Sequence, residues 1–185
     1  HEVNYRANVF ALKRYGARRL LSLSTIGSLD REVKPGDSAV PRQYIDRTKG
    51  SRKHTFCGGG VVGHVSLAHP ICPACEEHVK ALAQGADCTL HFDKTYLCME
   101  GPAFSTKAES VWYRSMGAQL IGMTAYPEYA LAREAGMCYL PCCFVSDYDC
   151  WDDSIPHVTI QEILDVMHKN NGRAYRLAAR IVSQE

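Results

Sequence analysis

The chain has 185 residues, a formal net charge of +1, and ordinary proportions of apolar (46%) and charged (22%) residues. That size suits one α/β domain over residues 1–185. A charge so close to zero gives no field for nucleic acid or acidic lipid, and no apolar run is as long as a membrane span, so we expect neither partner. The nine cysteines lie mostly in apolar runs. This placement predicts reduced, buried thiols and a cytoplasmic protein.

The first half of the chain alternates helix and strand signals. Apolar residues at helical spacing from Val3 to Leu12, closed by Gly16, predict a first helix. Residues 18–24 predict a short buried strand, and Gly27 marks a turn that either binds an anion through backbone N–H groups or simply reverses the chain. The next predicted elements are strand pieces over 38–40 and 43–46, a flexible loop over 48–62, a helix from 72 to about 84 and a strand over 88–99.

Cys72 and Cys75 form a CxxC motif where that helix starts, with His69 and His78 on either side. A structural zinc site usually takes four ligands from two spaced pairs. Because the sequence holds only one CxxC pair, we predict no metal, and we expect no other cofactor.

The second half continues the alternation. The strand over 88–99 leads to Phe104, an aromatic residue that belongs either to the core or to a binding platform at the sheet's end. The remaining predicted elements are helices over 106–116, 127–134 and 158–182, and strands over 119–123 and 137–145. This order predicts a mixed, largely parallel central sheet with helices on both faces.

The stretch 144–151, FVSDYDCW, follows the most apolar predicted strand, which has the composition of a strand buried on both faces. Ligands of open α/β sheets bind beyond the carboxyl ends of the strands, so Asp147 and Asp149 are placed for chemistry. Alternatively, Asp147 only forms a turn or caps a helix. Hydroxyl groups, an aromatic ring and carboxylates at one sheet edge together suit a nucleoside and an anion.

The chain resembles the trimeric purine nucleoside phosphorylase family. The matching stretches run in the family's order: HEVNYRANVFALK, STIGSL, PGD, QYIDRT, EGPAFSTKAES, GMTAYPEYALAREAG and SDYDCW. The resemblance implies a nucleoside phosphorylase-like fold and a homotrimer. It also implies cleavage of a purine N-glycosidic bond by inorganic phosphate, which is a co-substrate rather than a cofactor.

The resemblance also implies roles for single residues at the phosphate and nucleoside sites. Ser24 and Thr124 resemble phosphate contacts, and Thr25 lies beside them. Phe104 resembles the residue packed on the purine, and Met123 resembles the residue under the ribose.

Three further residues match positions around the base and the subunit boundary. Asp147 resembles the carboxyl group that faces the purine N7, and Asp149 resembles the one near the exocyclic amine. His64 resembles a residue that reaches into a neighbouring subunit's site. If Asp147 starts protonated as a general acid, its pKa must rise from about 3.9 towards 7, a cost on the order of 4 kcal/mol that burial can supply.

Two departures from the family's 6-oxopurine enzymes narrow the expected substrate. Those relatives carry Glu at Ser105 and Asn at Asp147, whereas an Asp suits a 6-aminopurine. They also place a His near the 5′-hydroxyl where this chain has Ile160, with Ile163 one turn on, and an apolar wall suits a methylthio group. We expect 5′-methylthioadenosine as substrate, with a 6-oxopurine nucleoside phosphorylase as the alternative.

The family's glycine-rich phosphate loop and its Arg–His phosphate pair lie upstream of the stretch that matches HEVNY. We therefore expect a companion N-terminal segment or chain that supplies sheet strands and phosphate ligands. The remaining alternative is an inactive nucleoside-binding fragment that needs such a chain.

Overall fold

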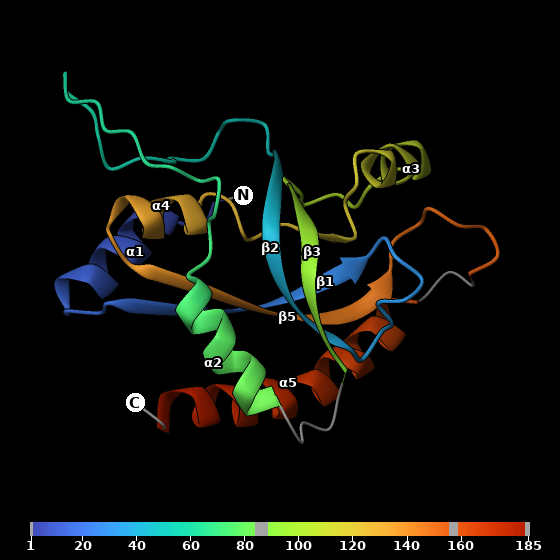
Figure 1. The fold of residues 1–185 in the computed structure, drawn as a ribbon. Helices are drawn as coiled ribbons and strands as arrows, with labels where there is room; N and C mark the ends of the chain where they lie inside the picture. Colours follow the sequence, from blue (N-terminus) through green and yellow to red (C-terminus); the bar gives the residue numbers. More distant parts are fainter. Residues whose placement is uncertain (1, 84–88, 156–158, 184–185) are drawn as a thin grey trace.

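The computed structural model describes residues 2–83, 89–155 and 159–183, except for the side chains at 82, 83, 160 and 182. Within these ranges the elements follow one another in mostly alternating order (Figure 1). They are α1 (Tyr5–Arg14), β1 (Arg19–Ser28), β2 (Ser38–Arg47), α2 (Pro73–Ala83), β3 (Leu90–Met99), α3 (Lys107–Ser115), β4 (Leu120–Gly122), α4 (Glu128–Glu134), β5 (Cys138–Tyr148) and α5 (Ile160–Ser183).

The described strands close into a barrel in the order β1-β4-β3-β2-β5. The pairs β1–β5, β2–β3 and β3–β4 are parallel, whereas β1–β4 and β2–β5 are antiparallel. Figure 1 shows α1 and α4 on one side of β1 and β5, and α2 and α5 on the other. The predicted mixed, largely parallel sheet with helices on both faces is therefore confirmed.

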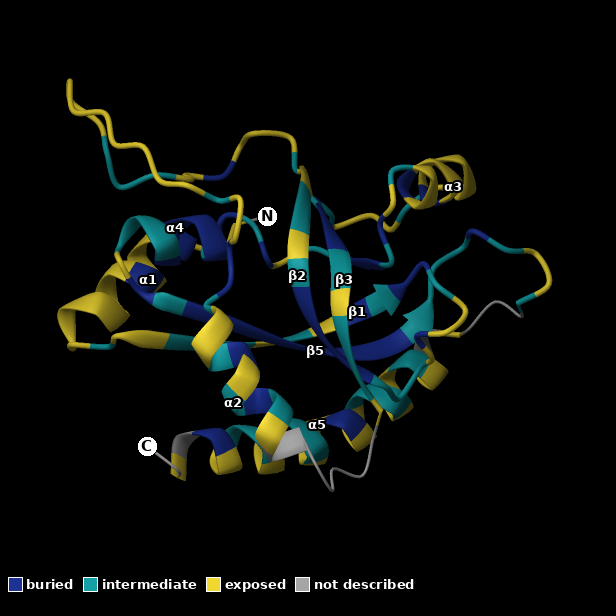
Figure 2. Ribbon diagram, in the orientation of Figure 1, coloured by how far each residue is buried: buried dark blue, intermediate teal, exposed yellow. Residues whose placement is uncertain are grey.

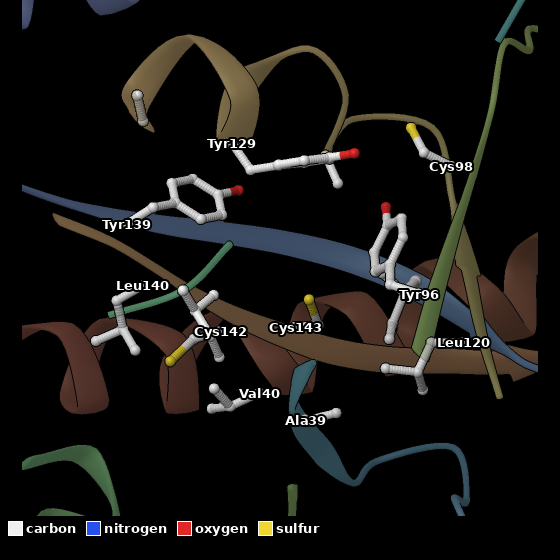
Figure 3. Close-up of a cluster of buried hydrophobic side chains, with 14 of the residues drawn as sticks. Ala39, Val40, Tyr96, Cys98, Leu120, Tyr129, Tyr139, Leu140, Cys142 and Cys143 are labelled. Carbon is white, nitrogen blue, oxygen red and sulfur yellow. The ribbon is translucent and has the colours of Figure 1, made fainter. Parts of the chain in front are cut away.

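β5 is the buried centre of the molecule. All eight residues from Tyr139 to Ser146 are buried, as expected for a strand covered on both faces. Figure 2 shows this strand as a dark band between α4 on one side and α2 and α5 on the other, all of them partly exposed. In the cluster drawn in Figure 3, Cys142 and Cys143 of β5 pack with Tyr96 of β3 and Tyr129 of α4. The thiols thus serve as small apolar residues in the core.

Local chemistry fixes where the helices begin and end. The Asn4 side chain caps α1 by accepting a hydrogen bond from the Ala7 N–H at 3.1 Å, and Gly16 follows this helix at a φ of 89°. Thr106 and Glu109 form a reciprocal capping box at the start of α3. None of the helices in the described ranges is long and apolar enough to cross a membrane.

Two local predictions were wrong. Gly27 lies inside β1, because pairing with β5 extends this strand to Ser28. The two predicted pieces around Pro41 form the single strand β2, which accommodates the proline through register shifts on both sides. The stretch 48–62 contains no helix or strand, as predicted, and it carries the buried side chain of Arg52.

Candidate active site

A β-bulge aims Asp147 at the carboxyl end of β5. Ile26 pairs with Val145 and Gly27 pairs with Asp147, so Ser146 is the extra residue. A Cβ atom on Gly27 would lie 3.6 Å from Asp147 Oδ2 and 3.1 Å from the Ile121 side chain. Glycine therefore leaves room beside the carboxyl group. Because Asp147 belongs to the strand, the turn or helix-cap alternative is wrong.

The surroundings of Asp147 favour its protonated form. Burial raises the pKa of this carboxyl group to about 6, and the charge of Asp149 acts in the same direction, while a hydrogen bond with Ser146 opposes the rise. A carboxyl group with this pKa exchanges its proton close to neutral pH. The shift has the direction that a general acid needs.

The Ser146 hydroxyl makes a contact with Asp147 that the sequence did not predict. Its Oγ lies within hydrogen-bond distance of the Ile26 carbonyl oxygen, at 3.2 Å, and of Asp147 Oδ1. A serine hydroxyl has one proton to donate, so it donates to one of these two oxygens at a time. When Ser146 donates to Asp147 Oδ1, it stabilises the carboxylate and lowers the pKa of Asp147 against the effect of burial. Ser146 therefore limits how far burial raises this pKa.

Asp149 offers a hydrogen-bond acceptor next to this acid. Its backbone N–H donates to the Ser28 carbonyl at 2.9 Å, and Trp151 Nε1 donates to the same oxygen at 3.0 Å, which anchors the segment. Asp149 Oδ2 is buried and has no hydrogen-bond partner in the described part of the chain. Such an oxygen is costly unless a donor reaches it, so the end of β5 is prepared for a ligand N–H group.

The loop after β3 brings an aromatic ring towards the same end of the barrel. The Phe104 side chain is 74% exposed, so the alternative that it belongs to the core is wrong. Cys150 Sγ donates to the carbonyl oxygen of Ser105 at 3.3 Å, which ties this loop to the residue after Asp149. The structure therefore joins the Ser105 and Asp149 segments and leaves the Phe104 ring free to stack.

Met123, at the exit of β4, packs tightly over the loop after β3. A Cβ atom on Gly101 would lie only 2.4 Å from Met123 Sδ, and Gly101 has a φ of 69°. Only glycine both leaves room for the Met123 sulfur and adopts this positive φ without strain. The close approach fixes Met123 between the exits of β3 and β4.

The three candidate phosphate residues lie on β1 and just beyond β4. Ser24 and Thr25 belong to β1, and Thr124 is the second residue after β4 ends at Gly122. The side chains of Thr25 and Thr124 are exposed, and the Ser24 hydroxyl donates to Cys143 Sγ at 3.4 Å. That their hydroxyl groups meet at one anion stays a prediction.

A buried ion pair, missed by the sequence analysis, holds two of these exits together. Arg52 Nε donates to Glu100 Oε1 at 2.7 Å, and the two side chains are only 2% and 7% exposed. The same guanidinium donates to the carbonyl oxygens of Met123, at 2.8 Å, and Glu100, at 2.9 Å. One arginine thus connects the exits of β3 and β4. Nothing in the polar run around Arg52 indicated this role.

The structure describes the side chains of two further predicted site residues and not that of a third. His64 is exposed in the loop before α2, and Ile163 is half-buried on α5. Ile160 opens α5, but its side chain lies outside the described part of the chain. Their roles stay predictions.

The fold is that of the nucleoside phosphorylases. The family model described as "Phosphorylase superfamily" matches residues 1–183. This chain therefore belongs to the phosphorylase superfamily.

Several relatives share one enzyme name. The S-methyl-5′-thioadenosine phosphorylase of Geobacter sulfurreducens is 46% identical over 100% of this chain and 65% of its own length. The enzyme of the same name from Thermofilum pendens is 48% identical over 98% of this chain and 68% of its own length. A crystal structure of methylthioadenosine phosphorylase from an antarctic soil metagenomic library has a TM-score of 0.91 and 44% identity, covering 99% of this chain and 64% of its own. The chain thus spans about two thirds of the length of these relatives.

Proposed function

We propose that this chain forms the nucleoside-binding part of a pentosyltransferase that cleaves 5′-methylthioadenosine with phosphate, giving adenine and 5-methylthioribose-1-phosphate. The observation that carries the proposal is the pairing of a carboxyl group whose pKa is raised to about 6, Asp147, with the unpartnered buried oxygen of Asp149. The shared enzyme name of relatives 46% and 48% identical supports it.

The two carboxyl groups divide the recognition of the base. The protonated Asp147 donates to the purine N7 as the bond to the sugar breaks, which relieves the negative charge on the departing base. Asp149 accepts a hydrogen bond from the exocyclic amine of adenine. Phe104 covers the ring, and Met123 lies under the ribose. A 6-oxopurine presents a carbonyl oxygen to Asp149 and so leaves both acceptors unsatisfied.

Phosphate supplies the nucleophile in this proposal. One of its oxygens bonds to the anomeric carbon as the bond from that carbon to the purine breaks, and its negative charge stabilises the cationic sugar. Ser24, Thr25 and Thr124 offer it hydroxyl groups. Because neutral hydroxyls balance no charge, the proposal includes a companion N-terminal segment or chain that adds a bidentate arginine.

The proposal extends to the 5′ side of the substrate and to the assembly. Ile160 and Ile163 form an apolar wall for the methylthio group, which leaves a 5′-hydroxyl unpaired. The enzyme is a homotrimer in which His64 reaches the ribose site of a neighbouring subunit. It works in the cytoplasm, in keeping with the eight free cysteines of the described residues.

A phosphorolysis assay tests the activity. Adenine release from methylthioadenosine and phosphate is followed for residues 1–185 alone and for the chain with an added N-terminal segment taken from a relative. We expect activity only with the added segment, and little with inosine. Full activity of residues 1–185 alone would show that the phosphate site is complete, and a preference for inosine would favour the 6-oxopurine alternative.

Sedimentation of the active preparation tests the assembly. We expect a trimer whose turnover falls when His64→Ala is introduced. An active monomer would refute both the trimer and the role of His64.

A further inference from the structure

Three cysteines from separate parts of the sequence meet at the end of the barrel opposite the candidate active site. Cys72 and Cys75 come from the start of α2, and Cys138 is the first residue of β5. Their sulfur atoms all lie within 4.8 Å of one another. Asp147 is nine positions after Cys138 along β5, a distance of about 30 Å in a strand. The thiol cluster is therefore independent of the nucleoside chemistry.

The spacing of the sulfurs suits a tetrahedral thiolate centre. Bonds of about 2.3 Å from zinc place sulfur ligands about 3.8 Å apart, so the cluster must contract by an ångström at most. The backbone N–H groups of Ala74 and Cys75 lie in hydrogen-bonding positions to Cys72. The N-terminus of a helix favours a thiolate, and the thiolate is the form that binds a metal.

A fourth donor lines the same cavity. The cavity has a volume of about 890 Å³ and contains Cys72, Cys75, Cys138 and His78 on its wall. Residues three apart on a helix lie on one face, so His78 follows Cys75 directly along α2. His78 Nε2 is buried and has no hydrogen-bond partner among the described residues. A buried ring nitrogen without a partner is unusual and is an available ligand atom.

The charges around the cluster complement such a centre. A zinc ion with three thiolates carries one net negative charge. Arg19 lies close enough to act electrostatically on Cys75, and Arg133 does so on Cys138. Positive side chains on two sides of the cluster thus offset the charge that the centre would bring.

We propose that Cys72, Cys75 and Cys138 bind a zinc ion as thiolates, with His78 as the fourth ligand. The ion clips the start of α2 to the start of β5. The sequence alone predicted no metal because Cys138 stands more than sixty residues after the CxxC motif, and only the fold brings it to the other two sulfurs.

Metal titration of the 185-residue chain under reducing conditions tests the site. We expect one zinc ion per chain by elemental analysis. Cobalt(II) should give an intense thiolate charge-transfer band and the visible spectrum of a tetrahedral ion. Cys138→Ser should weaken zinc binding by more than about 100-fold, and His78→Ala by about 10- to 100-fold, since changes to groups that only support metal ligands already cost 10- to 100-fold.

Two controls separate the site from general thiol chemistry and from misfolding. Cys57→Ser removes a half-buried free thiol outside the cluster and should leave zinc binding unchanged. Circular dichroism and the thermal midpoint with and without zinc show whether each variant folds, and bound zinc should raise the midpoint of the wild-type chain. Wild-type chain that is folded and reduced but binds no zinc would overturn the proposal. So would zinc binding that Cys138→Ser leaves unchanged.

Discussion

The two ends of β5 hold two different kinds of chemistry. At its carboxyl end lie two hard oxygen donors, Asp147 on the bulged strand and Asp149 just after it. At its amino end lies Cys138, with two further soft sulfur donors on a helix start. Between the two ends the strand is entirely buried. The middle of the strand therefore belongs to the packed core, and its reactive groups lie only at its two ends.

The two ends also differ in what completes them. At the amino end the three sulfur atoms already lie within 4.8 Å of one another, so a single ion would join them. At the carboxyl end burial raises the pKa of Asp147, and Asp149 keeps an oxygen without a partner in the described part of the chain. A ligand with both an acceptor and a donor, as a 6-aminopurine has, would complement that end.

The largest expected effect is a loss of turnover that leaves zinc binding at the other end of β5 unchanged. In the phosphorolysis assay of the chain with its added N-terminal segment, Asp147→Asn should lower kcat about 10²- to 10⁴-fold, because the proposed general acid is lost. Zinc binding at the other end should not change. Asp153→Asn, at an exposed carboxylate, is the matched control and should leave both properties intact. Wild-type turnover in Asp147→Asn would mean that this residue is not the acid.

The next effect concerns what holds the carboxyl-end exits together. Arg52→Ala should lower the free energy of unfolding by about 3–5 kcal/mol, because it leaves Glu100 buried without its partner. Arg31→Ala, which removes the exposed ion pair with Asp152, should cost no more than about 1 kcal/mol. Urea unfolding measures both. Equal losses of unfolding free energy in the two variants would show that Arg52 does not hold these exits together.

A smaller effect appears as a pH dependence of stability. The pKa of Asp147 is about 6 in the folded state, against 3.8 ordinarily. The folded chain thus binds more protons between these values, and the stabilisation present below pH 3.8 is lost as pH rises through 6. The loss amounts to at most about 3 kcal/mol. It should appear as the difference between wild type and Asp147→Asn in urea unfolding from pH 4 to 7. A difference that does not change with pH would show that Asp147 titrates normally.

The smallest effect isolates Ser146. Its hydrogen bond lowers the pKa of Asp147 against the effect of burial, so Ser146→Ala should move that pKa above 6. Ser146→Thr keeps a hydroxyl and should preserve the wild-type value. Carboxyl carbon NMR follows the titration directly. A pKa that falls in Ser146→Ala would contradict the role of Ser146 as a donor to the Asp147 carboxylate.

Most of the fold could be predicted from the sequence, because helices and strands alternate and the helix ends are marked by capping residues such as Gly16 and Thr106. The prediction failed where pairing between strands distant in sequence decides how far a strand extends. Gly27 belongs to a turn by composition, yet the partner strand extends β1 through it. The same limit applied to side chains, because the partners of Arg52 and Cys138 are remote in sequence. By contrast, Asp147 and Asp149 were predictable, since a buried strand leads straight into both.

Base binding by the 185-residue chain tests most directly the claim that the carboxyl end of β5 binds a 6-aminopurine. Calorimetry with adenine and hypoxanthine should show adenine binding at least about 10-fold more tightly, because hypoxanthine leaves the Asp149 oxygen unpaired. Asp149→Ala should abolish this preference. Equal affinity of the wild-type chain for the two bases, or a preference that survives in Asp149→Ala, would contradict the account.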